Sequence, residues 1–133
     1  MNLKVEVSVG EFLDKLTILE IKAERISDPA KNANVVKERD LLQATWEASH
    51  LAGADIAGKL GELKAVNEQL WEIEDRIREK EAAGAFDDEF IELARSVYIV
   101  NDKRAAVKRE LNVALGSDLI EEKSYSDYSR KNS

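Results

Sequence analysis

Residues 59–83 read KLGELKAVNEQLWEIEDRIREKEAA, and the spacing of their apolar side chains decides the fold class. These side chains recur at alternating intervals of three and four residues, which places them on one face of an α-helix. The sequence therefore predicts a long helix whose apolar face packs on another helix, ending at Ala83-Gly84. The residues of this face are Leu63, Val66, Leu70, Ile73 and Ile77.

The residues that follow predict a second long helix. Asp87 is a typical N-cap, and Phe86 is placed to pack on Ile91 one turn later. The helix should run to Leu115, because Gly116 is a natural C-terminal stop. Two long helices joined by a short turn predict an antiparallel hairpin.

Two more helices are expected before residue 59. Ser8 and Glu11 have the spacing of a capping box, which opens a helix over Val9–Ile26 that ends ahead of Pro29. A further helix is predicted over Ala33–Ser49. The glycines that we interpret as a loop leading into the third helix near Lys59 are Gly53, Gly58 and Gly61.

The first seven residues have a different periodicity. Leu3, Val5 and Val7 alternate with Lys4 and Glu6, which is typical of a short half-buried strand. A single strand needs a partner, and the same strand of a second subunit would supply one in a homodimer.

The first helix also hints at a dimer, because it is apolar on two sides and such a helix is usually buried on two sides. One side carries Phe12, Leu16, Leu19 and Ala23, and the other carries Ile18 and Ile21.

We therefore expect an all-α protein: an antiparallel helical bundle or long hairpin of about four helices with one short N-terminal β-strand. Residues 1–133 form a single domain, in which 117–133 is a polar C-terminal tail. The tail has apolar side chains through which it can dock on the helices, namely Leu119, Ile120, Tyr125 and Tyr128.

Composition excludes several classes of site. The 133-residue chain has no cysteine and one histidine, His50, so zinc–thiolate and cysteine-nucleophile sites are excluded, and no metal or cofactor is expected. Its net charge of −7 argues against nucleic-acid binding. The sequence lacks a signal peptide and a long apolar run, so we expect a soluble cytoplasmic protein without membrane contact.

Several polar side chains fall on helix faces that should be buried. Arg104 lies within an apolar stripe of the last helix, with Asn101 and Lys108 close to it. On the third helix a polar line flanked by an aromatic side chain borders the apolar face, and Glu20 lies in the apolar sector of the first helix. The candidate ligand-binding residues are Glu20, Asn67, Trp71, Glu74, Arg78, Asn101, Arg104 and Lys108.

Two interpretations of these residues stay open. Glu20 and Glu74 can neutralise two of the three cations Arg78, Arg104 and Lys108, which leaves one positive charge to bind a small anionic molecule. Alternatively, the network is structural: a closed set of salt bridges fixes the helix register, and two amides satisfy the remaining donors. Its members would be Glu20, Glu74, Arg78 and Arg104, with the amides of Asn67 and Asn101.

Two other classes of function also fit the sequence. A noncatalytic helical interaction module would use the two-sided first helix, and substitutions at Ile18 and Ile21 would then destroy partner binding. A magnesium-dependent all-α nucleotide hydrolase would use paired carboxylates such as Glu72 and Asp75.

The chain resembles a family of short bacterial and viral helical proteins of unassigned function. The resemblance rests on VSVGE at 7–11, DKLTILEIK at 14–22, NxxLWxIEDxIR at 67–78, ARSVY at 94–98, NDxR at 101–104 and LIEEKSY at 119–125. A related family with a similar opening motif lies near sugar-transfer genes for surface polysaccharides. The resemblance therefore implies a sugar phosphate or nucleotide sugar as ligand, and it implies that Tyr125 folds back to close the pocket.

Overall fold

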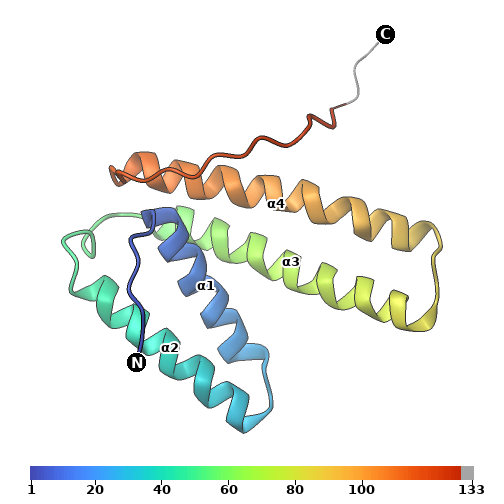
Figure 1. The fold of residues 1–133 in the computed structure, drawn as a ribbon, viewed down its shortest axis with the longest axis horizontal. Coiled ribbons are helices and arrows are strands. Elements are labelled where there is room, and N and C mark those ends of the chain that lie inside the picture. Colours follow the sequence, from blue (N-terminus) through green and yellow to red (C-terminus); the bar gives the residue numbers. More distant parts are fainter. Residues whose placement is uncertain (130–133) are drawn as a thin grey trace.

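The computed structural model describes residues 1–129 and is all-helical over that range. The helices are α1 (Val9–Arg25), α2 (Pro29–Glu47), α3 (Ala57–Ala83) and α4 (Asp88–Ala114). Figure 1 shows two antiparallel hairpins, α1–α2 and α3–α4, which meet near the start of α1 and diverge from there. The predicted all-α class and helix order are confirmed.

Helix α1 is the centre of the fold, because it packs against all three other helices, whereas α2 packs only against α1. Leu13, Leu16, Leu19 and Ile21 of α1 are all buried. Side chains from both apolar sides of α1 are thus buried within one chain, and Ile18 is half-buried, so this pattern does not require a dimer. Since Ile21 is 1% exposed, it belongs to the core and not to a free docking face.

Two predicted helix starts need correction, whereas α1 begins at Val9 as predicted. Helix α2 begins at Pro29, because the Asp28 carboxylate accepts hydrogen bonds from the next turn and proline suits the first helical position. Helix α3 begins at Ala57, so Gly58 and Gly61 lie within it. The capping box is half formed: Ser8 Oγ accepts from the Glu11 N–H at 3.1 Å, but the Glu11 carboxylate binds Lys108.

The predicted N-terminal strand is not present within residues 1–129 of the single chain. Residues 1–8 carry no regular structure, and no other described segment lies beside them as a strand. Leu3 and Val5 are 91% and 79% exposed. Since strand geometry is stabilised by pairing, a lone segment of this kind has nothing to hold it in a sheet.

The tail docks along part of α4, and Tyr128 is one of the predicted side chains that contact this helix. Figure 1 shows it running back beside that helix. Tyr128 packs edge-on against Tyr98 with ring centres 4.9 Å apart, and Glu122 pairs with Arg109 at 2.9 Å. Tyr125 is 84% exposed and closes no pocket.

Some of the helices are long, but they are not uniformly apolar. None of the helices in residues 1–129 has an apolar stretch long enough to cross a bilayer.

Candidate functional site

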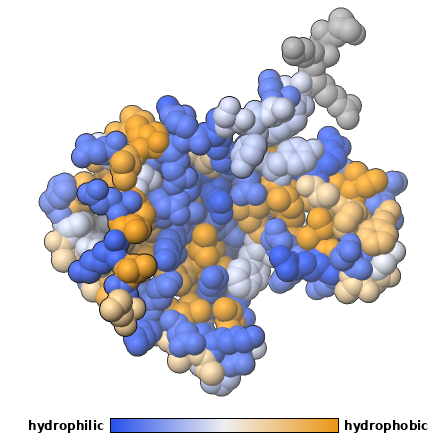
Figure 2. Space-filling view, viewed as in Figure 1, coloured by the Kyte–Doolittle hydropathy of each residue, from blue (hydrophilic) through white to orange (hydrophobic). Residues whose placement is uncertain are grey.

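An open groove of about 490 Å³ lies where α1, α3 and α4 meet. Figure 2 shows an indentation of the surface between the α1–α2 hairpin and the outer part of the α3–α4 hairpin. Its apolar floor comes from Ile18, Ile21, Leu70 and Trp71. Three helices thus contribute to one concave surface of the size that small ligands occupy.

Six of the eight predicted residues line this groove. Four of them lie on α3 and two on α4. The lining residues from the prediction are Asn67, Trp71, Glu74, Arg78, Asn101 and Arg104.

The groove carries an excess of positive charge, although the chain as a whole is acidic. Lys22, Arg78 and Arg104 face two carboxylates, Glu74 and Asp75. Arg78 Nε already binds Glu74 at 3.2 Å, and this pair is largely exposed. The remaining two cations face one remaining carboxylate.

Arg104 is the cation best placed to bind a ligand. It is half-buried on α4, and within residues 1–129 neither an ion pair nor a hydrogen bond engages its guanidinium. The same side chain also borders a small hollow beneath the tail. A guanidinium with its donors free inside a groove is suited to bind a carboxylate or phosphate.

Glu20 does not reach the groove. Its carboxylate lies 3.8 Å from Lys64 Nζ, next to the Lys64–Glu24 pair at 2.7 Å. The predicted pairing of Glu20 with an arginine of α3 or α4 is therefore not formed, because α1 crosses α3 with Glu20 facing Lys64.

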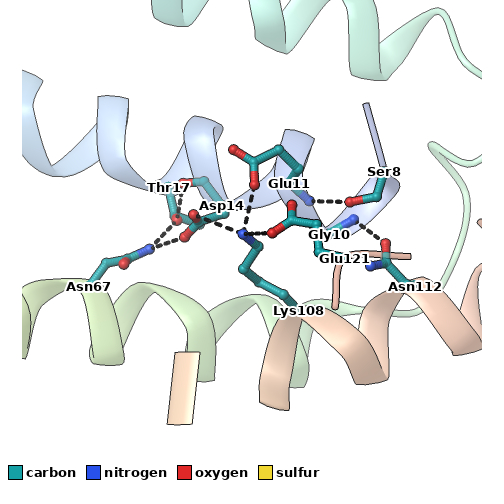
Figure 3. Close-up of polar contacts among 9 residues, drawn as sticks. All are labelled: Ser8, Gly10, Glu11, Asp14, Thr17, Asn67, Lys108, Asn112 and Glu121. Carbon is teal, nitrogen blue, oxygen red and sulfur yellow. Dashed lines mark hydrogen bonds and ion pairs between the residues drawn. The ribbon is translucent and has the colours of Figure 1, made fainter. Parts of the chain in front are cut away.

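Lys108 also lies outside the groove and forms the centre of a separate polar cluster. Its ammonium contacts Glu11 at 2.7 Å, Glu121 of the tail at 3.3 Å and Asp14 at 3.7 Å. Figure 3 shows the side chain reaching from α4 to α1 beneath these carboxylates. This is not the salt-bridge network expected from the sequence, because the partners of Lys108 are Glu11, Asp14 and Glu121; through them Lys108 joins α1, α4 and the tail.

The charges around Lys108 shift the pKa values of the cluster. Burial alone would lower the pKa of the Lys108 ammonium, but the hydrogen bond to Glu11 and the charge of Asp14 outweigh it and leave that pKa raised. Hydrogen bonds from Glu121 and Lys108 lower the pKa of Glu11, and the hydrogen bond with Glu11 raises that of Glu121. Lys108 therefore stays charged, and as the pH falls Glu121 is protonated before Glu11.

Asn67 links this cluster to the groove. Its side-chain nitrogen donates to Asp14 Oδ1 at 2.8 Å and to Thr17 Oγ1 at 3.0 Å, as Figure 3 shows. All three residues are buried. The amide nitrogen of Asn67 is thus engaged in holding α1 on α3, although the residue borders the groove.

Gly10 sets how closely α1 approaches α4. Its N–H donates to Asn112 Oδ1 at 2.6 Å, and a methyl group at this position would lie 2.5 Å from the Lys108 carbonyl oxygen. Nothing larger than glycine fits here without moving a helix.

Sequence reasoning missed the buried polar residues of α1. Gly10, Asp14, Thr17 and Ile21 follow one another at intervals of four, three and four, which places them on one helical face. An acidic residue on the same face as a core isoleucine was the signal that would have identified the buried Asp14.

The magnesium interpretation has no geometric support in the described chain. Glu72 is exposed and pairs with Arg25 at 3.4 Å, while Asp75 faces the groove. In residues 1–129, no three side chains of the metal-binding types converge. The two carboxylates are better described as surface and groove charges.

Comparison with known proteins places this architecture in a family. A family model described as a family of unknown function, DUF6165, matches residues 3–132. The chain belongs to the DUF6165 family. No curated protein and no solved structure matches it. The roles of the groove and of the Lys108 cluster therefore follow from the chemistry of the residues that form them.

Proposed function

We propose that this DUF6165 protein binds a small anionic metabolite, a sugar phosphate or nucleotide sugar, in the groove between α1, α3 and α4. The observation that carries the proposal is that the half-buried Arg104 lines the groove, while within residues 1–129 neither an ion pair nor a hydrogen bond engages its guanidinium. A phosphate that reaches Arg104 can accept charge-assisted hydrogen bonds from guanidinium donors that are not engaged within residues 1–129.

The other groove residues fit the rest of such a ligand. Arg78 and Lys22 can bind further phosphate oxygens, and Asn101 offers a donor and an acceptor for hydroxyl groups. Trp71 presents an aromatic surface on which a sugar ring or base can pack. We assign this site a binding role and no reaction.

A thermal-shift panel tests the proposal. Inorganic phosphate, glucose 1-phosphate, UDP-glucose, nucleotides and dicarboxylates are each added to the purified protein, with and without magnesium. A ligand at about 100 times its dissociation constant should stabilise the fold by roughly 2.7 kcal/mol, which is several degrees.

The matched variants are Arg104→Met and Arg95→Met. Arg95 is exposed on the same helix and does not line the groove. Loss of a charge-assisted hydrogen bond should weaken binding by roughly tenfold or more in Arg104→Met and leave Arg95→Met unchanged. A panel without any stabilising compound, or equal loss in both variants, would contradict the proposal and favour the interaction module.

A further inference from the structure

The N-terminal segment exposes apolar side chains and an unpaired backbone. Leu3, Val5 and Val7 are 91%, 79% and 44% exposed. Within residues 1–129, the backbone groups of residues 1–7 form no hydrogen bond. An extended segment with alternating apolar residues and free N–H and C=O groups can pair with another strand.

This segment is complementary to itself in the antiparallel direction. Residues 3–7 read LKVEV. If two copies pair with Val5 opposite Val5, then Lys4 of each copy lies opposite Glu6 of the other. The apolar residues are paired on the opposite face, because Leu3 then lies opposite Val7. Opposite charges facing each other across a strand pair stabilise that register.

The parallel alternative lacks this complementarity. In an in-register parallel pair, Lys4 lies opposite Lys4 and Glu6 lies opposite Glu6, and like charges in these positions are destabilising. The charge pattern therefore selects the antiparallel arrangement with twofold symmetry.

The surface next to the segment has apolar side chains on which a two-stranded β-ribbon, formed by two paired copies of the segment, can pack. A hollow of about 900 Å³ separates residues 1–3 from α1 and α2, and its walls include Leu3, Leu41 and Leu42. Leu41 is 57% exposed. A two-stranded ribbon is marginal alone and gains stability when its apolar face packs on a helix.

We propose that two copies of this chain pair through residues 3–7 as an antiparallel β-ribbon, with Val5 on the twofold axis and a Lys4–Glu6 ion pair on either side. The dimer is independent of ligand binding in the groove, because residues 3–7 do not line it.

Charge reversal tests the register. Lys4→Glu and Glu6→Lys each place like charges opposite one another at two positions, so each variant alone should raise the dimer dissociation constant roughly tenfold or more. The double variant should restore the wild-type constant, and a mixture of the two single variants should form heterodimers. Sedimentation equilibrium and native mass spectrometry measure these outcomes, with Lys103→Glu on α4 as the control.

Two results overturn the proposal. If the wild type stays monomeric at about 0.5 mM, its dimer dissociation constant is in the millimolar range or weaker, and the proposed pairing does not occur. Single variants that dimerise like the wild type overturn it as well.

Cross-linking tests the symmetry directly, because the chain has no cysteine of its own. Val5→Cys places two thiols opposite each other across the axis, whereas Leu3→Cys places them four residues apart. Under mild oxidation Val5→Cys should form the covalent dimer at least several-fold faster. Equal rates for the two variants overturn the antiparallel register.

Discussion

At the scale of single residues, Lys108 neutralises Asp14, a carboxylate of α1 that is buried against α3. Asp14 is 4% exposed, and its oxygens are held by Asn67 and by the Lys108 ammonium. A buried carboxylate that loses its cation cannot regain water, which makes the lysine a stabilising residue and not a ligand-binding one.

Replacing Lys108 should therefore destabilise the fold. We expect Lys108→Met to lower the free energy of unfolding by about 3 kcal/mol, because Asp14 is left buried and unpaired. Adding Asp14→Asn removes the uncompensated charge while its side-chain oxygen still accepts from Asn67, so the double variant should recover much of the loss. Urea unfolding measures both variants. A double variant no more stable than Lys108→Met would show that charge is not the cause.

At the scale of the helices, two glycines near the starts of their helices differ in what surrounds them. Gly10 lies against the Lys108 carbonyl, whereas a methyl group on Gly61 would meet nothing within 4 Å. Both glycines lie in helices, and only their surroundings distinguish them.

Alanine substitutions should separate these two glycines. Gly10→Ala should cost about 1–3 kcal/mol, because α1 must move away from α4. Gly61→Ala should stabilise α3 by about 0.5–1 kcal/mol, since alanine favours the helix and narrows the unfolded ensemble. Thermal unfolding of both variants gives the comparison, and a neutral Gly10→Ala would contradict the close approach of α1 to α4.

The helices themselves could be predicted because their signals are local. Asp87 caps α4 as expected, and Gly84 ends α3 in the left-handed conformation. The predicted start of α2 is misplaced because Pro29 was interpreted only as the end of the first helix, although a proline that follows an acidic N-cap also opens a helix.

The tertiary pairing of charges could not be predicted in the same way. The helical wheel correctly directed Arg104 and Glu74 toward one groove, since both lie beside apolar stripes. It could not tell that Glu20 meets Lys64 or that Lys108 meets Glu11, because these pairs depend on how α1 crosses the other helices. A helical wheel gives the direction in which each side chain points around its own helix axis. It does not give the angle at which two helices cross.

At the scale of the whole molecule, the two functions that we propose lie on different surfaces. The groove opens between the two hairpins, while the ribbon-forming segment lies beside α1 and α2 (Figure 1). The Lys108 cluster lies between α1, α4 and the tail, and it holds the groove walls in place without entering the groove. Binding and dimerisation can therefore be tested separately.

The most direct test of the account uses the two tryptophans. Trp71 lines the groove, whereas Trp46 packs against Phe12 with ring centres 6.2 Å apart and is not part of it. Their indole N–H signals are followed by NMR during titration with glucose 1-phosphate and with UDP-glucose. The account predicts that the Trp71 signal moves in a saturable manner, that the Trp46 signal stays in place, and that Arg104→Met abolishes the change. If both signals move together, or if neither moves at millimolar ligand, the groove is not the binding site.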